Sequence, residues 1–432
     1  MPKIQMRRDT AANWKSVNPT LLAGEWALET DTKKMKIGNG TTNYNSLEYF
    51  KKEDNEWENP SEWIDIRSGA ISNSVYFLVA HSSDYTQYAK FSMKASVSTA
   101  ANTYDVFVDG IKIASTASDT ATTLDWQTLA LTSGFDVTYP AALRTHIVRI
   151  TPTVSTDTLT VLKNVAVSGQ SEQGMLWIHF TANNEMNLQN LTGAGSNCVN
   201  NLLEAVTSQS GSLKFVAGGG GWLLRYSPNL KTIPVLDYSG NSAYFNYIAA
   251  NQTKLKNVVI KNASAVENAD GAFSSSSSIE HIEFDNVNTG SNANFSYMLN
   301  RCSSLKKIPT MDYTSATNMA GFIANAVPLE NTYLDLSQAS GLKIIGFYGD
   351  SSHFVSGLKG IVVSSSAPFD GNSPQINVSY TGLDRAALVA LFNSLPTVTN
   401  SQVCNVTGCT GAADLTESDL AIATGKGWTV TR

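Results

Sequence analysis

The sequence has few cysteines, and their spacing does not favour a metal site or a disulfide framework. The four cysteines of the 432 residues are Cys198, Cys302, Cys404 and Cys409. Only Cys404 and Cys409 lie close together, and their spacing of five is not that of a zinc-ligand pair. We therefore expect buried free thiols, with a disulfide or a metal site as the alternative.

The chain also lacks a long apolar run and an excess of basic residues. No stretch approaches the roughly 18 apolar residues of a membrane span, and the start "MPKIQMRRDTAANW" lacks the apolar core of a signal peptide. We expect a protein that is made in a cytoplasm, is not exported by the general secretion route and does not insert into a membrane. The net charge of -6 argues against a nucleic-acid partner.

Catalytic and cofactor motifs are missing as well. None of the five histidines has a metal-ligand spacing or a neighbouring nucleophile, and no phosphate-binding loop or nucleophile elbow occurs. The Gly-rich "AGGGGW" (217–222) lacks the Lys and Ser/Thr of a phosphate loop, so we interpret it as a tight join. Glu280 and Glu283 could serve a glycosidase, but we expect them on a solvated surface. The sequence thus predicts a non-catalytic binding protein with no metal and no cofactor.

Charged residues are concentrated at the front of the chain. Residues 1–58 hold 18 of the 66 charged residues, and the other 374 residues, rich in Ser, Thr, Asn, Gly and Ala, hold 48. Within the front segment we expect three short strands, in "KIQMRR", at Trp26–Glu29 and at Met35–Ile37. About 45 residues bury too little apolar surface to be stable alone. Without cysteines or a ligand cluster in this segment, oligomerisation is the remaining way to complete it.

Residues 4–49 resemble the N-terminal module of many phage tail fibres and receptor-binding proteins, which is related to the N-terminal domain of the phage major tropism determinant. The family's fixed spacings are met by Arg8-Asp9-Thr10, by Gly24-Glu25 with Thr30-Asp31, and by Lys34 with Gly38-Asn39-Gly40-Thr41. The resemblance implies an intertwined β-prism trimer that joins a fibre to the virion. The residues that we assign to trimerisation or attachment are Arg8, Asp9, Trp26, Asp31, Ile37, Gly38 and Gly40. A monomeric capping hairpin is the alternative.

Short strands at intervals of eight to ten residues follow, which favours a β-sandwich over residues 57–170. The expected strands are 63–67, 75–80, 89–97, 104–115 as a hairpin, 124–131, 146–153, 159–167 and 175–180. Asp109-Gly110 suits a two-residue type I′ turn in "VFVDGIKI". Residues 100–155 are similar to jelly-roll carbohydrate-binding modules, which implies an exposed aromatic that stacks on a sugar. The candidates are Trp126, Tyr85 and Tyr88, and the alternative for Trp126 is a place in the sandwich core.

A repeat begins near residue 200. Apolar anchors at Leu230, Leu255, Ile279, Leu305 and Leu329 are 25, 24, 26 and 24 residues apart, and a second apolar residue precedes each by six or seven. This period is typical of a leucine-rich-repeat solenoid. It resembles the irregular repeats of BspA-type bacterial surface proteins, but it lacks the asparagine ladder. Helices at 383–395 and 415–427, the second with a Thr416–Asp419 capping box, should close the array.

The predicted fold class is a multidomain, β-rich chain. It comprises a small trimeric β-prism at 1–56, a central antiparallel, jelly-roll-like β-sandwich at 57–170, and an α/β leucine-rich-repeat solenoid at 171–432. Side chains between the buried anchors of each solenoid strand should point outward. The receptor-binding candidates among them are Asn257, His281, Glu283, Lys307, Asn331 and Tyr333. A merely solvated face, or one covered by a neighbouring protomer, is the alternative.

These features together predict a homotrimeric phage tail-fibre protein of the virion. Its N-terminus should contact other tail or baseplate proteins, and its repeats should bind a bacterial surface glycan or protein. A cell-surface leucine-rich-repeat adhesin is the first alternative, although the chain shows neither an export signal nor a lipoprotein cysteine near its start. A fibre-borne polysaccharide depolymerase is the second.

Overall fold

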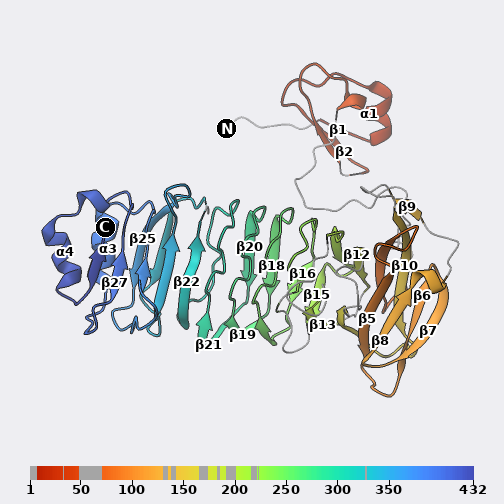
Figure 1. Cartoon of the computed structure of the whole chain (residues 1–432). Helices are drawn as coiled ribbons and strands as arrows, with labels where there is room; N and C mark the ends of the chain where they lie inside the picture. The colour runs from red at the N-terminus through yellow and green to blue at the C-terminus, as the bar shows by residue number, and fades with distance from the viewer. Residues whose placement is uncertain are drawn as a thin grey trace. The chain divides into compact units, whose positions relative to one another are not determined.

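The structure is a computed structural model, and contacts divide the chain into two units, 1–56 and 57–432 (Figure 1). It describes residues 7–32, 34–47, 71–129, 135–137, 143–164, 174–181, 185–190, 201–215, 221, 223–325 and 328–432. Some of the predictions fall outside these residues. They concern the strand at 63–67, Cys198, the domain boundary at 170/171 and all of "AGGGGW" except Gly221. No helix in the described ranges is long and apolar enough to cross a membrane.

The first unit is a small sheet with one helix. Its strands are β1 (Arg7–Asp9), β2 (Trp26–Glu29) and β3 (Met35–Ile37), with β2 parallel to β1 and antiparallel to β3. Helix α1 (Ala11–Val17) follows β1, and a 3₁₀ turn, η1, spans Tyr44–Ser46. Helix α1 is not predicted by the sequence pattern, because its seven residues are too few to show a helical period.

The core of the first unit is correspondingly small. It consists of Trp14, Leu21, Ala27 and Tyr44, with the Trp14 and Tyr44 rings stacked at 4.9 Å. The Tyr44 hydroxyl donates to the buried Glu29 carboxylate at 2.7 Å. Among the described residues of this unit, the apolar core is limited to these four side chains and the partly buried Leu47.

The second unit begins with two sheets of mostly antiparallel strands that pack around a common core. One sheet contains β4 (Val75–Ser82), β6 (Thr103–Val108), β7 (Ile111–Ala117), β9 (Phe135–Val137), β10 (Leu143–Pro152) and β12 (Met175–Phe180). The other contains β5 (Lys90–Val97), β8 (Thr120–Asp125), β11 (Leu159–Asn164) and β13 (Glu185–Asn190). Between β6 and β7, Asp109 (φ 48°) and Gly110 (φ 83°) adopt the two positive φ angles that a type I′ turn requires.

Both sheets continue into a β-solenoid of about 14 turns. In the first of these sheets, β12 pairs in parallel with β14 (Ala205–Ser208). In the other sheet, β11 pairs in parallel with β13, β13 with β15 (Ser212–Phe215), and β15 with β16 (Val235–Asp237). The same hydrogen-bonded sheets therefore run through the antiparallel strands and the first turns. No break in the sheets separates the predicted sandwich from the predicted solenoid.

Each middle turn supplies strands to two parallel sheets, which Figure 1 shows as stacked rows. The sheet that contains β13, β15 and β16 continues with β18 (Asn257–Lys261) and β20 (His281–Asp285), and we call this part the first solenoid sheet. A separate sheet, the second solenoid sheet, contains β17 (Ser242–Tyr244), β19 (Ser264–Asn268), β21 (Thr289–Asn294), β22 (Ala316–Ala324), β24 (Ile344–Tyr348), β26 (Ile376–Asn377), β27 (Val403–Asn405) and β28 (Thr429–Thr431). A separate pair, β23 (Thr332–Leu336) and β25 (Leu358–Val363), lies nearer the C-terminus.

The repeat anchors form the solenoid core. Leu230, Leu255, Ile279, Leu305 and Leu329 are all buried, and so are the five apolar residues that precede them. The chain between anchors forms a second strand in most of these turns, rather than the helix of an α/β repeat. Asn262, Ser275 and Asn286, among others, take positive φ, which bends the chain sharply from one strand to the next.

Two helices close the array at its C-terminal end, as the sequence predicts. They are α3 (Arg385–Ser394) and α4 (Glu417–Thr424), and the predicted Thr416–Asp419 capping box is present. Arg385 joins the helices by donating from Nε to Asp419 Oδ2 at 2.8 Å and from Nη2 to Oδ1 at 3.2 Å.

The Arg385–Asp419 pair should make the stability of α4 depend on pH. The guanidinium of Arg385, with the backbone and side chain of Thr416, holds the pKa of Asp419 far below its usual range. In the unfolded chain the pKa of an aspartate is about 4, so at higher pH the ionised carboxylate of Asp419 stabilises the fold. This stabilisation is lost progressively as the pH falls below about 4. We expect Asp419→Asn to reduce the hydrogen-exchange protection of residues 417–424 at pH 7 and to flatten its acid dependence. Glu417→Gln, whose side chain is 90% exposed, is the control, and wild-type protection in Asp419→Asn would contradict the prediction.

The cysteines in the described part of the chain are free. Cys302, Cys404 and Cys409 are all buried. Burial raises the pKa of the Cys302 thiol to about 12 and that of Cys404 further. These thiols are therefore protonated core side chains, which agrees with the expectation for these three.

Candidate functional site

Four of the six receptor-binding candidates lie on strands of the solenoid surface, Asn257 on β18, His281 and Glu283 on β20, and Tyr333 on β23. Lys307 and Asn331 were expected on strands as well, but Lys307 lies in the segment between β21 and β22 and Asn331 lies directly before β23. Inward residues such as Val258, Ile282 and Leu334 are buried. The candidates Asn257, His281, Glu283, Lys307, Asn331 and Tyr333 are all exposed. We call this surface the outer face.

Ion pairs between successive turns cross the outer face. Lys256 Nζ lies 3.4 Å from Glu280 Oε1, and Lys306 Nζ lies 3.3 Å from Glu330 Oε1. Within strand β20, His281 Nε2 lies 3.6 Å from Glu283 Oε2. Because their members are about half exposed, such pairs add little to stability. They leave a polar surface of both charge signs that is open to solvent.

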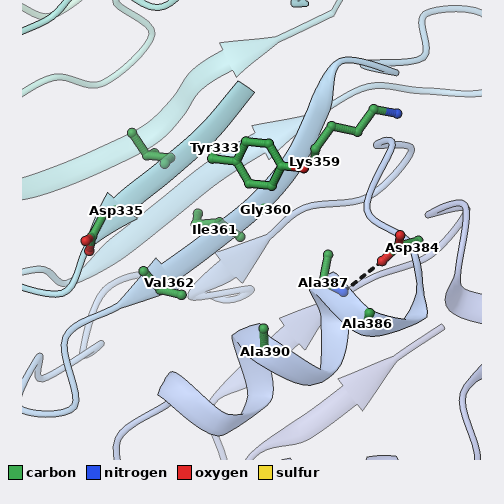
Figure 2. Close-up of a pocket in the computed structure, with 11 residues that line it drawn as sticks. Tyr333, Asp335, Lys359, Gly360, Ile361, Val362, Asp384, Ala386, Ala387 and Ala390 are labelled. Atoms are coloured by element: carbon green, nitrogen blue, oxygen red, sulfur yellow. Dashed lines mark hydrogen bonds between the residues drawn. The ribbon is translucent and has the colours of Figure 1, made fainter. Parts of the chain in front are cut away.

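A groove of about 440 Å³ lies beside the outer face, between the β23–β25 pair and helix α3 (Figure 2). Tyr333 and Asp335 of β23 line one side, and Gly360 and Val362 of β25 line the floor. The helix wall consists of three alanines, Ala386, Ala387 and Ala390. Their short side chains leave the space between helix and strands unfilled.

Tyr333 is the most prominent side chain in the groove. It is 75% exposed, and its ring lies across Gly360 of the next strand (Figure 2). A Cβ at residue 360 would stand 2.7 Å from Tyr333 Cδ1, a distance at which either the ring or the backbone must shift. Glycine at this position therefore allows the tyrosine ring to lie against the strand.

Three charged residues also line the groove, Asp335, Lys359 and Asp384. The backbone N–H of Ser337 donates to Asp335 Oδ1 at 2.9 Å, which keeps the pKa of Asp335 below its usual value. Asp384 caps α3 by accepting the Ala387 N–H at 2.8 Å, and the Lys359 side chain extends away from the Tyr333 ring at the edge of the groove (Figure 2). The groove thus combines an apolar floor and an aromatic ring with two carboxylates and an ammonium group.

The sequence pattern predicts that Tyr333 is exposed, but it does not predict the groove. Its other members are a glycine within a strand, small helical residues and a helix N-cap, and each has an ordinary structural explanation. The glycine inside "LKGIVV" was the available signal, because a glycine in a strand often marks a close approach.

The structure corrects the assignment of Trp126 as a sugar-stacking residue. Trp126 is 1% exposed and lies in short helix α2 (Trp126–Leu129), which replaces the second half of the strand expected at 124–131. Its ring stacks on His81 at 5.6 Å and on His146 at 5.1 Å. A ring covered in this way has no face for a sugar, so the alternative place in the core is the correct one.

Tyr85 and Tyr88, the other two stacking candidates, are half-buried in the loop after β4. Tyr85 stacks on His81 at 5.1 Å, so one face of its ring is occupied. Tyr88 packs against a small cluster that includes Trp177. Neither ring is as open to solvent as Tyr333.

Several predicted attachment residues have contacts within the first unit itself. Asp9 accepts from the Thr10 N–H and Asn13 Nδ2, and Asp31 accepts from the Ala11 N–H, so both support the start of α1. A Cβ on Gly38 would stand 2.2 Å from the Leu22 carbonyl oxygen, and Gly40 has a φ of +82°. These residues explain the family motif as a requirement of the local fold.

The remaining attachment candidates face outward. Arg8 is exposed, and Trp26 and Ile37 lie opposite each other on β2 and β3 and are partly exposed. Val17 and Leu22 are 69% and 73% exposed. The first unit therefore presents apolar side chains at its surface.

Within the described ranges, no three His, Cys, Asp or Glu side chains form a group that could hold a metal ion. The acidic candidates Glu280 and Glu283 are exposed, and they lie beside Lys256 and His281, respectively.

The fold is that of a β-solenoid with a separate small N-terminal unit, an architecture typical of extended binding proteins. Residues 4–42 match the family model for the major tropism determinant N-terminal domain. The match covers less than a tenth of the chain and lies in the first unit. A search of curated proteins and a search of solved structures found no match. The matched module indicates a phage tropism or tail-fibre protein that is associated with the virion.

Proposed function

We propose that this chain is a non-catalytic phage tail-fibre protein whose first unit attaches to the virion and whose outer face recognises a receptor on the bacterial surface. The observation that carries the proposal is the family match at residues 4–42. The outer face and its groove support it, because they offer varied side chains on a rigid stack of turns.

Trimerisation is part of the proposal. The first unit buries only a few apolar side chains and exposes Val17 and Leu22, so contacts between copies would complete its core. Three outer faces on one support would engage a dense bacterial surface together, and avidity would raise the binding strength of weak single sites.

The mass in solution tests the trimer. The chain has a mass of 46.4 kDa, so light scattering should give three times this value, about 139 kDa. We expect Leu22→Glu to shift the purified protein toward smaller species, because it places a charge in the proposed contact. Lys254→Glu, at an exposed residue of the solenoid, should leave the mass unchanged. A monomeric mass for the unmodified chain at micromolar concentration would exclude the trimer.

Intact phage particles test the attachment to the virion. Antibody fragments raised against the purified chain should label the tail region in electron micrographs and should reduce adsorption to host cells. Fragments against an unrelated protein are the control. Absence of the chain from purified particles would refute the proposed function.

A further inference from the structure

We propose that the groove between Tyr333, Gly360 and helix α3 is a pyranose-binding subsite, and that the receptor is therefore a bacterial surface polysaccharide. This inference rests on the proposed function and specifies its ligand. It follows from the placement of an exposed aromatic ring, a space-making glycine and three charged side chains around one open groove.

The exposed ring is the first argument. Tyr333 leaves 75% of its surface in solvent, although burial of an aromatic side chain is strongly favourable. Figure 2 shows the ring lying broadside over the strand, with the helix wall across the groove. A pyranose ring carries a face of C–H groups, and such a face packs against an aromatic ring without leaving polar groups unpaired.

Gly360 is the second argument. It is not among the glycines with positive φ, so the backbone conformation does not require glycine there. Glycine inside a strand costs about 0.5–1 kcal/mol relative to alanine. The contact that it permits is the Tyr333 ring, since a Cβ would stand 2.7 Å from that ring. The strand thus contains a residue of low strand propensity whose structural effect is to leave room for the ring.

The charged rim is the third argument, and it favours a ligand with many hydroxyl groups. Asp335, Lys359 and Asp384 come from β23, from β25 and from the start of α3. Carboxylates accept hydrogen bonds from hydroxyls, and an ammonium group donates to them. Small-ligand sites commonly combine an apolar floor with a few polar groups that fix orientation.

The same geometry disfavours a peptide. At the end of β25 the Val363 N–H already donates to Ser394 Oγ of α3 at 3.1 Å, so this position is closed to an added strand. The volume of about 440 Å³ lies toward the lower end of the range for small-ligand pockets, and it is too small for a docked helix.

The outer face extends the subsite into a longer site. Asn331 lies two residues before Tyr333, and Lys307 and His281 belong to preceding turns. Neighbouring strands are about 4.8 Å apart, so a polysaccharide anchored in the groove would pass successive rows of polar side chains. The repeating sugar units of a polysaccharide would thus contact side chains of successive solenoid turns.

The test uses the purified chain of 432 residues and surface polysaccharide extracted from host cells and freed of protein. We expect saturable binding in biolayer interferometry, and we expect Tyr333→Ala to weaken it about tenfold or more. Tyr333→Phe should retain most of the affinity, because it keeps the ring. Gly360→Val should weaken binding by displacing the ring.

Tyr244→Ala is the matched control. Tyr244 is 45% exposed on β17, which belongs to the other sheet, and its loss should leave binding unchanged. Unchanged circular dichroism and melting temperature of Tyr333→Ala would show that the loss is local. Because residue 333 is exposed, we expect this variant to fold normally.

The outcomes separate the inference from the proposed function. One outcome is that the chain still binds host cells after periodate has oxidised their glycans and does not bind the polysaccharide. That result would overturn the glycan inference and leave the receptor-binding function standing. Polysaccharide binding that is unchanged in Tyr333→Ala would overturn the assignment of the site. Failure to bind either cells or polysaccharide would overturn both.

Discussion

Replacing Gly357 with alanine is expected to disrupt the stacking of two successive solenoid turns and to lower the free energy of unfolding by about 3 kcal/mol or more. A Cβ at this residue would stand 1.5 Å from the Leu329 carbonyl oxygen and 2.1 Å from its carbonyl carbon. Both atoms belong to the backbone of the preceding turn, so no side-chain rotation can relieve the overlap. The Gly357 carbonyl also accepts the Thr332 N–H at 2.7 Å, and this bond joins the same two turns.

In a solenoid the stability is approximately a sum of contributions from each turn and each contact between neighbours. Loss of one contact should therefore separate the unfolding of the C-terminal turns from that of the rest. Urea unfolding followed by fluorescence, with hydrogen exchange of residues 358–432, measures both effects. Gly341→Ala is the control, because a Cβ there lies no closer than 3.4 Å to its neighbours. A wild-type midpoint for Gly357→Ala would contradict the prediction.

Replacing Trp126 with alanine is expected to destabilise the two antiparallel sheets by about 3–5 kcal/mol through loss of buried surface and creation of a cavity. The ring is 1% exposed and stacks on both His81 and His146. His146 in turn contacts Asp109 at 2.7 Å through Nδ1, and the Ile147 N–H donates to the same carboxylate at 2.9 Å. Removal of the tryptophan would thus also loosen the β6–β7 turn.

Trp126→Phe keeps an aromatic ring in the core and should cost less. It also removes the indole N–H, which finds no hydrogen-bond partner in the part of the chain that the structure describes. Thermal unfolding of the three proteins gives the comparison. Equal stability of Trp126→Ala and wild type would contradict the packing that we describe. Neither variant should change binding to polysaccharide at a temperature where it remains folded.

Local signals in the sequence predicted many elements correctly. The Asp109-Gly110 pair marked a hairpin, because few other dipeptides take two positive φ angles easily. The 24–26-residue period identified the buried anchors, because only side chains at equivalent places in each turn can stack in one core. The Thr416–Asp419 capping box marked the start of α4, because its bonds lie within four residues.

The errors occurred where longer-range contacts decide the structure. Helix α1 is too short to show a period and depends on Asp9 and Asp31, which lie on opposite sides of it in sequence. The segments between anchors became strands in most turns, because a neighbouring turn was available to complete their hydrogen bonds. The sequence around Trp126 is compatible both with a buried tryptophan and with an exposed one that stacks on a sugar. Only the positions of His81 and His146 in the fold, on which the Trp126 ring stacks, distinguish the two.

The sequence by itself determined the N-terminal module, the repeat period and the side chains that point outward, because each depends on residues close together or at a fixed spacing. Only the tertiary structure decided that Tyr333 lies over Gly360 and faces Ala386, Ala387 and Ala390 across an open groove. Gly360 and the three alanines lie 27 to 57 positions after Tyr333 in the sequence. Their proximity results from the pairing of β23 with β25 and the packing of α3 beside them, and a linear pattern carries no record of that packing.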